Sequence, residues 1–201
     1  MSLDKLFSFS RLVTEFGRIP RAVRIPKTED WENDVEHSYH LAMMAWYIVD
    51  SNSVALNKDL ILTYALVHDF VEVHAGDTYI YSEDIEHLAS KKEREHAAAL
   101  KLRKELPEFS ALHANIEKYE KQEDDESKFV WALDKILPIL HGYDDAGRTW
   151  REQGVTLQML LDKKGPQVAV SKEVQEYFGE LANLLERNQE SLFGTRTTGQ
   201  A

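Results

Sequence analysis

The sequence predicts an all-α fold, a compact single-domain bundle of roughly six to eight helices. Apolar residues recur at helical spacing, and runs of β-branched residues with a period of two are absent. Glycine and proline, which interrupt helices, number only 9 and 5. The length of 201 residues suits one hydrophobic core. We therefore expect one domain over residues 1–193 and a flexible tail over 194–201.

The first two helices are expected at 35–50 and 57–74. The second of them has Asn57 or Asp59 as its N-cap. The first presents an apolar face that holds Leu41, Met44 and Ile48. Further helices are expected at 85–106, 109–121, 126–143, 149–161 and 171–193. Irregular segments are expected where proline or glycine interrupts the pattern, at 17–33, at 75–84 and across Gly165-Pro166.

Composition excludes several classes of protein. The chain has no cysteine, which excludes disulfides and cysteine-ligated zinc, so that any metal must be held by His, Asp or Glu. A net charge of -11 argues against binding a nucleic acid polymer, which requires a basic surface. No stretch is apolar enough to cross a membrane, and the N-terminal residues do not resemble a signal peptide. A cytoplasmic location is therefore expected.

Four potential metal ligands lie within the expected helices: His37, His68, Asp69 and Asp134. Asp134 follows the apolar run 129–133, and a buried carboxylate there costs several kcal/mol unless it is paired or binds a cation. Pro138 lies four residues later and is expected to kink or end that helix. Residue types alone leave the bland alternative open, in which Asp134 pairs with a buried Lys or Arg and the histidines only pack.

A family resemblance extends over residues 18–143. The segments Glu36-His37-Ser38, His68-Asp69 and Leu133-Asp134 resemble the H…HD…D signature of the HD-domain phosphohydrolases. The pattern HDxxEVxxGD, which begins at His68 and ends at Asp77, is similar to the branch that contains the bacterial 5′-deoxynucleotidases. The resemblance implies an HD-type helical fold, with the C-terminal helices at 147–193 added to the motif region.

The resemblance implies one divalent transition metal, Co, Mn, Fe, Ni or Zn with Mg also allowed, held by His37, His68, Asp69 and Asp134. It implies that Glu72 positions or deprotonates an attacking water. Asp77 would contact the substrate and share in water activation, on a loop that Gly76 allows to turn back. The implied reaction is hydrolysis of a phosphate ester without a covalent intermediate.

The basic segment near residue 18 resembles the part of the family in which an arginine contacts the substrate phosphate. Arg18 is the first candidate, followed by Arg21 and Arg24, against the alternative that these are solvated loop charges. The deoxynucleotidases carry a tryptophan beside this arginine that helps to reject the ribose 2′-hydroxyl. This chain has Ile19 there, which leaves ribose selectivity and the phosphorylation level of the substrate open.

Three functions are therefore weighed. The first is removal of phosphate from a (deoxy)nucleoside 5′-monophosphate. The second is the same chemistry on nucleoside di- or triphosphates or on nucleoside-analogue phosphates. The third is a non-catalytic protein with a structural metal. Two further features stay open. A homodimer is one assembly that the resemblance allows, and the apolar helix with Leu181, Leu184, Leu185 and Leu192 would either supply its interface or pack on the core. A second metal would need two histidine ligands from among His74, His87, His96 and His113.

Overall fold

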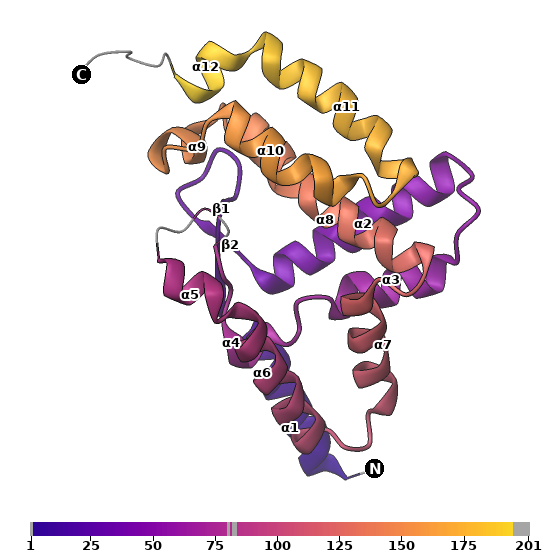
Figure 1. Cartoon of the computed structure of the whole chain (residues 1–201). Coiled ribbons are helices and arrows are strands. Elements are labelled where there is room, and N and C mark those ends of the chain that lie inside the picture. Colours follow the sequence, from indigo (N-terminus) through magenta and orange to yellow (C-terminus); the bar gives the residue numbers. More distant parts are fainter. Residues whose placement is uncertain (1, 80, 82–83, 195–201) are drawn as a thin grey trace. The chain divides into compact units, whose positions relative to one another are not determined.

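The protein is described by a computed structural model that covers residues 2–79, 81 and 84–194 (Figure 1). Helices dominate this part of the chain, and its one sheet pairs β1 (Pro20–Arg24) with β2 (Trp31–Asn33). The all-α prediction is confirmed. Two compact units are present: residues 1–22 together with 31–130, and residues 23–30 together with the chain from 131 onward. The single domain over 1–193 stays a prediction, and the tail expected at 194–201 lies, except for Gly194, outside the described residues.

The first unit packs short helices against one another. Helix α2 (Asp34–Ser51) contacts α3 (Lys58–Val67), which contacts α7 (Ser110–Lys121). The short helix α4 (Glu72–Ala75) contacts both α1 (Leu3–Phe16) and α6 (Lys91–Glu105). Helix α1 and the two strands are not among the expected elements. The unit contains α1 (Leu3–Phe16), α2 (Asp34–Ser51), α3 (Lys58–Val67), α4 (Glu72–Ala75), α5 (Ile85–Ala89), α6 (Lys91–Glu105), α7 (Ser110–Lys121) and the start of α8 (Asp125–Asp144).

The prediction of a continuous helix at 57–74 is wrong. Asn57 is the N-cap, since its side chain accepts a hydrogen bond from the N–H of Leu60 at 3.2 Å, but α3 ends at Val67. The next helix begins at Glu72, so His68 and Asp69 lie on the turn between two helices. The helix expected at 85–106 is likewise divided, at Ser90.

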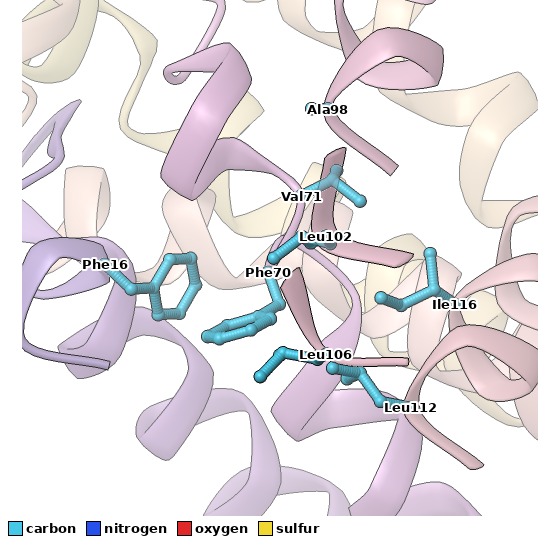
Figure 2. Packing of buried hydrophobic residues seen from close by; sticks show 8 residues of the cluster. All are labelled: Phe16, Phe70, Val71, Ala98, Leu102, Leu106, Leu112 and Ile116. Carbon is cyan, nitrogen blue, oxygen red and sulfur yellow. The ribbon is translucent and has the colours of Figure 1, made fainter. Parts of the chain in front are cut away.

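A buried apolar cluster holds the first unit together (Figure 2). Phe70 and Val71 enter it from the turn after α3, and the rings of Phe16 and Phe70 meet edge to face with centroids 5.3 Å apart. Each large side chain buried in this way contributes roughly 1.5–3 kcal/mol to folding. The cluster consists of Phe16, Phe70, Val71, Ala98, Leu102, Leu106, Leu112 and Ile116.

The second unit contains the rest of α8, α9 (Arg148–Glu152), α10 (Leu157–Val168), α11 (Lys172–Arg187) and α12 (Gln189–Phe193). Helix α10 packs on α11, and α12 packs on α9 and α11. The helix expected at 149–161 is in fact two, separated at Gly154, whose φ of +66° interrupts helical geometry. Three of the four C-terminal leucines, Leu181, Leu185 and Leu192, are buried, and a homodimer stays a prediction.

Two prolines lie inside helices, and neither of them ends the helix that contains it. Helix α10 continues through Pro166, where a break was expected, and α8 continues through Pro138 to Asp144.

Among the residues that the structure describes, no helix combines the length and the apolar character needed to cross a membrane.

Candidate metal centre

His37 is fully buried near the start of α2. The side chain of Asn33 accepts hydrogen bonds from the N–H groups of Val35 and Glu36, and the Glu36 carboxylate accepts one from the N–H of Asn33. This capping box fixes where the helix begins and therefore where His37 lies. The Nδ1 atom of His37 is 3.3 Å from Oε2 of the buried Glu32. A carboxylate in this place fixes the tautomer and ring orientation of a metal-binding histidine.

His68 and Asp69 lie on the turn between α3 and α4. The Nδ1 atom of the buried His68 is 3.0 Å from the carbonyl oxygen of Ala65. Because a carbonyl oxygen can only accept, Nδ1 donates, and Nε2 is the nitrogen with the lone pair that a metal requires. This Nε2 atom lies 3.0 Å from Oδ2 of Asp69.

These three side chains gather around one point. His37, His68 and Asp69 each offer a ligand atom, and the three atoms lie within 4.8 Å of one another. The imidazole rings of the two histidines have centroids 5.4 Å apart. Two imidazoles and one carboxylate are donors that suit Mn, Fe, Co, Ni or Zn. The residues present therefore fit the divalent cation that the sequence motif implies.

Asp134 belongs to the second unit and is buried at 4% exposure. Its Oδ2 atom accepts a short hydrogen bond from the ammonium group of Lys135, which also lies over the ring of Trp131 at 4.2 Å. The expectation that this carboxylate is buried and needs a cationic partner agrees with these contacts. Its role as a fourth metal ligand stays a prediction.

Glu72 begins α4 and is 3% exposed. Its Oε2 atom is buried without a hydrogen-bond partner among the described residues. Burial, and then the charges of Asp69 and Asp77, raises the pKa of Glu72 to about 11. A cation beside Asp69 would offset this repulsion and bring the pKa of Glu72 down, so the unpartnered oxygen also fits a metal site.

Asp77 lies half-buried on the loop that follows α4. Gly76 precedes it with a φ of +73°, a conformation that favours glycine, so the chain can turn sharply at this point. The charge of Asp77 raises the pKa of both Glu72 and Asp34. Its carboxylate is therefore within electrostatic range of the group around Asp69.

The structure separates the three candidate arginines. The Nη1 atom of Arg21 donates to Oδ2 of Asp69 at 2.8 Å, and the Arg21 side chain is only 11% exposed. Arg18 is 68% exposed and bonds to Glu15 at 2.5 Å. Arg24 belongs to the second unit, where it pairs with Glu152. Arg21, and not the first candidate Arg18, contacts a candidate metal ligand.

Two charged residues near the site, Asp34 and Lys91, were not predicted from the sequence. Asp34, the first residue of α2, is fully buried and forms with Asp69 and Glu72 a second group whose oxygen atoms lie within 4.8 Å. Burial opposes the charged form of Lys91, but Glu95, Glu72 and Asp69 raise its pKa above the usual value. An acid in the first turn of a helix ordinarily indicates capping, and Lys91 lies in a charged run, so neither stood out.

The four histidines considered for a second metal have other partners or no metal-capable neighbours. His74 pairs with Glu105 at 2.8 Å, and His87 contacts Arg94. The Nε2 atom of His113 lies 2.8 Å from a backbone carbonyl oxygen, and His96 is exposed. In the part of the chain that is described, none of the four belongs to a group able to hold a metal.

Comparison with known proteins identifies the family. A model of the HD domain matches residues 17–175. The 5′-deoxynucleotidases HDDC2 of Mus musculus and Homo sapiens are each 36% identical over 145 residues, which cover 70% of this chain and 70% and 69% of theirs. The crystal structure of a predicted metal-dependent phosphohydrolase from Magnetospirillum magnetotacticum MS-1 superposes with a TM-score of 0.79 and 32% identity, over 92% of this chain and 96% of that one.

A conserved hypothetical protein from Pyrococcus furiosus, at 21% identity and a TM-score of 0.60, shares the fold over 92% of this chain and 99% of that one. The resemblance drawn from the motifs is confirmed, because the family match spans more than half of the chain and includes His37, His68, Asp69 and Asp134. The chain belongs to the HD-domain family.

Proposed function

We propose that this chain is a metal-dependent phosphohydrolase that releases phosphate from a nucleotide, with a (deoxy)nucleoside 5′-monophosphate as the first candidate substrate. One observation carries the proposal. His37, His68 and Asp69 converge within 4.8 Å, beside a buried Glu72 carboxylate whose Oε2 has no hydrogen-bond partner among the described residues. The HDDC2 relatives, named 5′-deoxynucleotidases, support the substrate class.

His37, His68 and Asp69 would hold the cation, and Asp134 is proposed as the fourth ligand. When bound, a divalent cation offsets phosphate charge and lowers the pKa of water. The donor set favours Co, Mn, Fe, Ni or Zn, although Mg remains allowed. Glu32 would hold the His37 ring in place through Nδ1, at 3.3 Å.

Glu72 is proposed as the general base. Its Oε2 takes a proton from the water that attacks phosphorus, the bond from phosphorus to the 5′ oxygen breaks, and the nucleoside leaves after protonation from solvent. A cation bound beside Asp69 would lower the pKa of Glu72 from about 11, so that the carboxylate is ionised at neutral pH and can accept this proton. Asp77 is proposed to orient the water and the substrate. Arg21 and Lys91 are the cations proposed to meet the phosphate.

The test is release of inorganic phosphate from ribo-, deoxyribo- and analogue nucleotides at each phosphorylation level. Each substrate is assayed with Mn²⁺, Co²⁺, Mg²⁺ or a chelator. Glu72→Gln keeps the shape of the side chain and should lower kcat by at least about a hundredfold. Arg21→Ala and Arg18→Ala form a matched pair, because both remove one arginine from the same segment but only Arg21 contacts Asp69.

The outcomes separate the candidate functions. Metal-dependent release from monophosphates, lost in Glu72→Gln, is the expected result. Release from di- or triphosphates or from analogues alone would support the second candidate, which is open because Ile19 stands where the deoxynucleotidases carry a tryptophan. If the metal-bound protein released no phosphate from any substrate, the proposal would be contradicted and a structural metal would be favoured.

A further inference from the structure

A buried ion-pair network joins the start of α2 to the candidate metal ligands. Asp34 is fully buried, and its Oδ1 accepts a hydrogen bond from Nη1 of Arg21 at 3.1 Å. The same Nη1 atom donates to Oδ2 of Asp69 at 2.8 Å. The Nε atom of Arg21 lies 3.6 Å from Oε2 of Glu32. One guanidinium therefore faces three carboxylates, two of which are almost fully buried.

Helix capping does not explain Asp34. The cap of α2 is already made by Asn33 and Glu36, whose reciprocal hydrogen bonds measure 3.0 Å. The backbone N–H of Asp34 donates instead to the carbonyl oxygen of Ile19 at 3.3 Å. The start of α2 is thus tied directly to the segment that carries Arg21, and the carboxylate of Asp34 is left for the arginine.

Stability does not explain Asp34 either. Burying a carboxylate costs several kcal/mol, and its attraction to one guanidinium offsets this cost only in part. The second oxygen of Asp34, Oδ2, is buried without a hydrogen-bond partner among the described residues, which adds to the cost. Replacing a buried ion pair with apolar residues of similar volume is often neutral or stabilising in proteins. Because the buried carboxylate of Asp34 destabilises the fold, we expect it to have a role in the site instead.

The geometry indicates that Asp34 orients the guanidinium of Arg21. The N–H donors of a guanidinium lie in one rigid plane. The two hydrogen bonds of Nη1, to Asp34 and to Asp69, therefore fix the orientation of the whole group, including Nη2, and the Glu32 carboxylate attracts it on the Nε side at 3.6 Å. Without the contact to Asp34, the long side chain of Arg21 would be able to occupy several rotamers while it still reached Asp69.

We propose that Asp34 is a positioning residue for Arg21, which it holds in the single orientation that receives the substrate phosphate. The inference rests on the proposed function, because it assigns Arg21 to the phosphate of the same site. It differs from that function in naming Asp34 as the source of the arginine's orientation. Loss of Asp34 should therefore weaken phosphate binding more than it slows the chemical step.

Three variants of the full chain test this inference. Asp34→Ala removes the contact, Asp34→Asn keeps the shape and an acceptor oxygen, and Asp50→Ala removes the same charge from the exposed end of α2. Asp34→Ala should raise KM for the best nucleotide, and Ki for inorganic phosphate, by about tenfold, with kcat within about threefold of the wild type. Asp34→Asn and Asp50→Ala should stay within about threefold for each constant.

A double-mutant cycle shows whether Asp34 acts through the arginine. In an Arg21→Ala background, Asp34→Ala should change KM by less than about twofold. An unchanged KM and Ki in Asp34→Ala would overturn the inference, as would a tenfold effect that persists without Arg21. Thermal unfolding of each variant checks that the fold is retained.

Calorimetric titration of the Mn²⁺-loaded protein with inorganic phosphate keeps this inference separate from the proposed function. If the wild type released no phosphate from any nucleotide, the proposed function would fail. The effect of Asp34→Ala on the Kd of phosphate would still decide the role of Asp34: a weakening of about tenfold supports it, and an unchanged Kd overturns it.

Discussion

One turn of the chain supplies two regions with opposite chemistry. Residues 68–72 give His68, Asp69 and Glu72 to the polar group around the candidate metal site, and Phe70 and Val71 to the apolar cluster. The apolar cluster stabilises the fold through burial (Figure 2). The polar group opposes folding, because several carboxylates leave water and repel one another.

The difference shows how stability and function are divided in this unit. The apolar residues hold the turn in place, and the polar residues use that rigidity to stay close together although they repel. A substitution on one side of the turn should therefore change a different property from a substitution on the other. The following experiments test this separation, beginning with the largest expected effect.

Asp69→Asn should abolish activity while leaving the apolar cluster intact. Phosphate release should fall by at least about a thousandfold, because an amide is a poor ligand for the cation. A chelator should cause the same loss in the wild type, and added Mn²⁺ should reverse it. Phosphate assays and thermal unfolding measure the two properties. A variant that keeps about a tenth of wild-type activity would show that Asp69 is not a ligand.

Phe70→Ala should have the opposite effect. The cavity left between Phe16 and the other cluster residues should lower the free energy of unfolding by about 3–5 kcal/mol. Denaturant titration measures this loss. At a temperature where the variant is folded, it should still bind one equivalent of Mn²⁺. A destabilisation under about 1 kcal/mol would mean that the cluster does not hold the turn.

The pH dependence of stability should reveal the cost of burying carboxylates and, after it, of their mutual repulsion. The pKa of Asp34 rises from 3.8 to about 7, so the folded state binds more protons than the unfolded state in that interval. The contribution of Asp34 to the free energy of unfolding of the metal-free protein should therefore fall as pH rises from about 4 to 7, and that of Glu72 should fall at higher pH. In Asp34→Asn, the free energy of unfolding should depend less on pH between about 4 and 7. The same pH dependence in the metal-free wild type and in Asp34→Asn would contradict the cost of burying Asp34.

Arg18→Ala should have the smallest effect. Arg18 is 68% exposed and pairs with Glu15, and exposed pairs contribute between zero and about 1 kcal/mol. Both KM and the thermal midpoint should stay close to wild-type values, whereas Arg21→Ala should raise KM. If Arg18→Ala and Arg21→Ala changed KM equally, the arginine that contacts Asp69 would not be the one that binds the phosphate.

Much of the fold could be predicted from local signals. The N-cap at Asn57 and the helices near 109–121 and 126–143 follow from capping and from apolar periodicity, and the structure places helices there. The break after Val67 could not be predicted in this way. The apolar pattern continues across it, and the turn accompanies the packing of Phe70 and Val71 into the cluster, whose other members come from distant parts of the chain.

The sequence by itself determined the helical class, the family and the candidate ligands, because periodicity, motif order and residue chemistry are local properties of the chain. Only the tertiary structure decided which charges meet. It brought Arg21 to Asp69 across 48 residues, left Arg18 in solvent, and buried Asp34 among other acids. The physical reason is desolvation: a charge acquires its cost and its partner from the residues packed around it, and these come from distant parts of the chain.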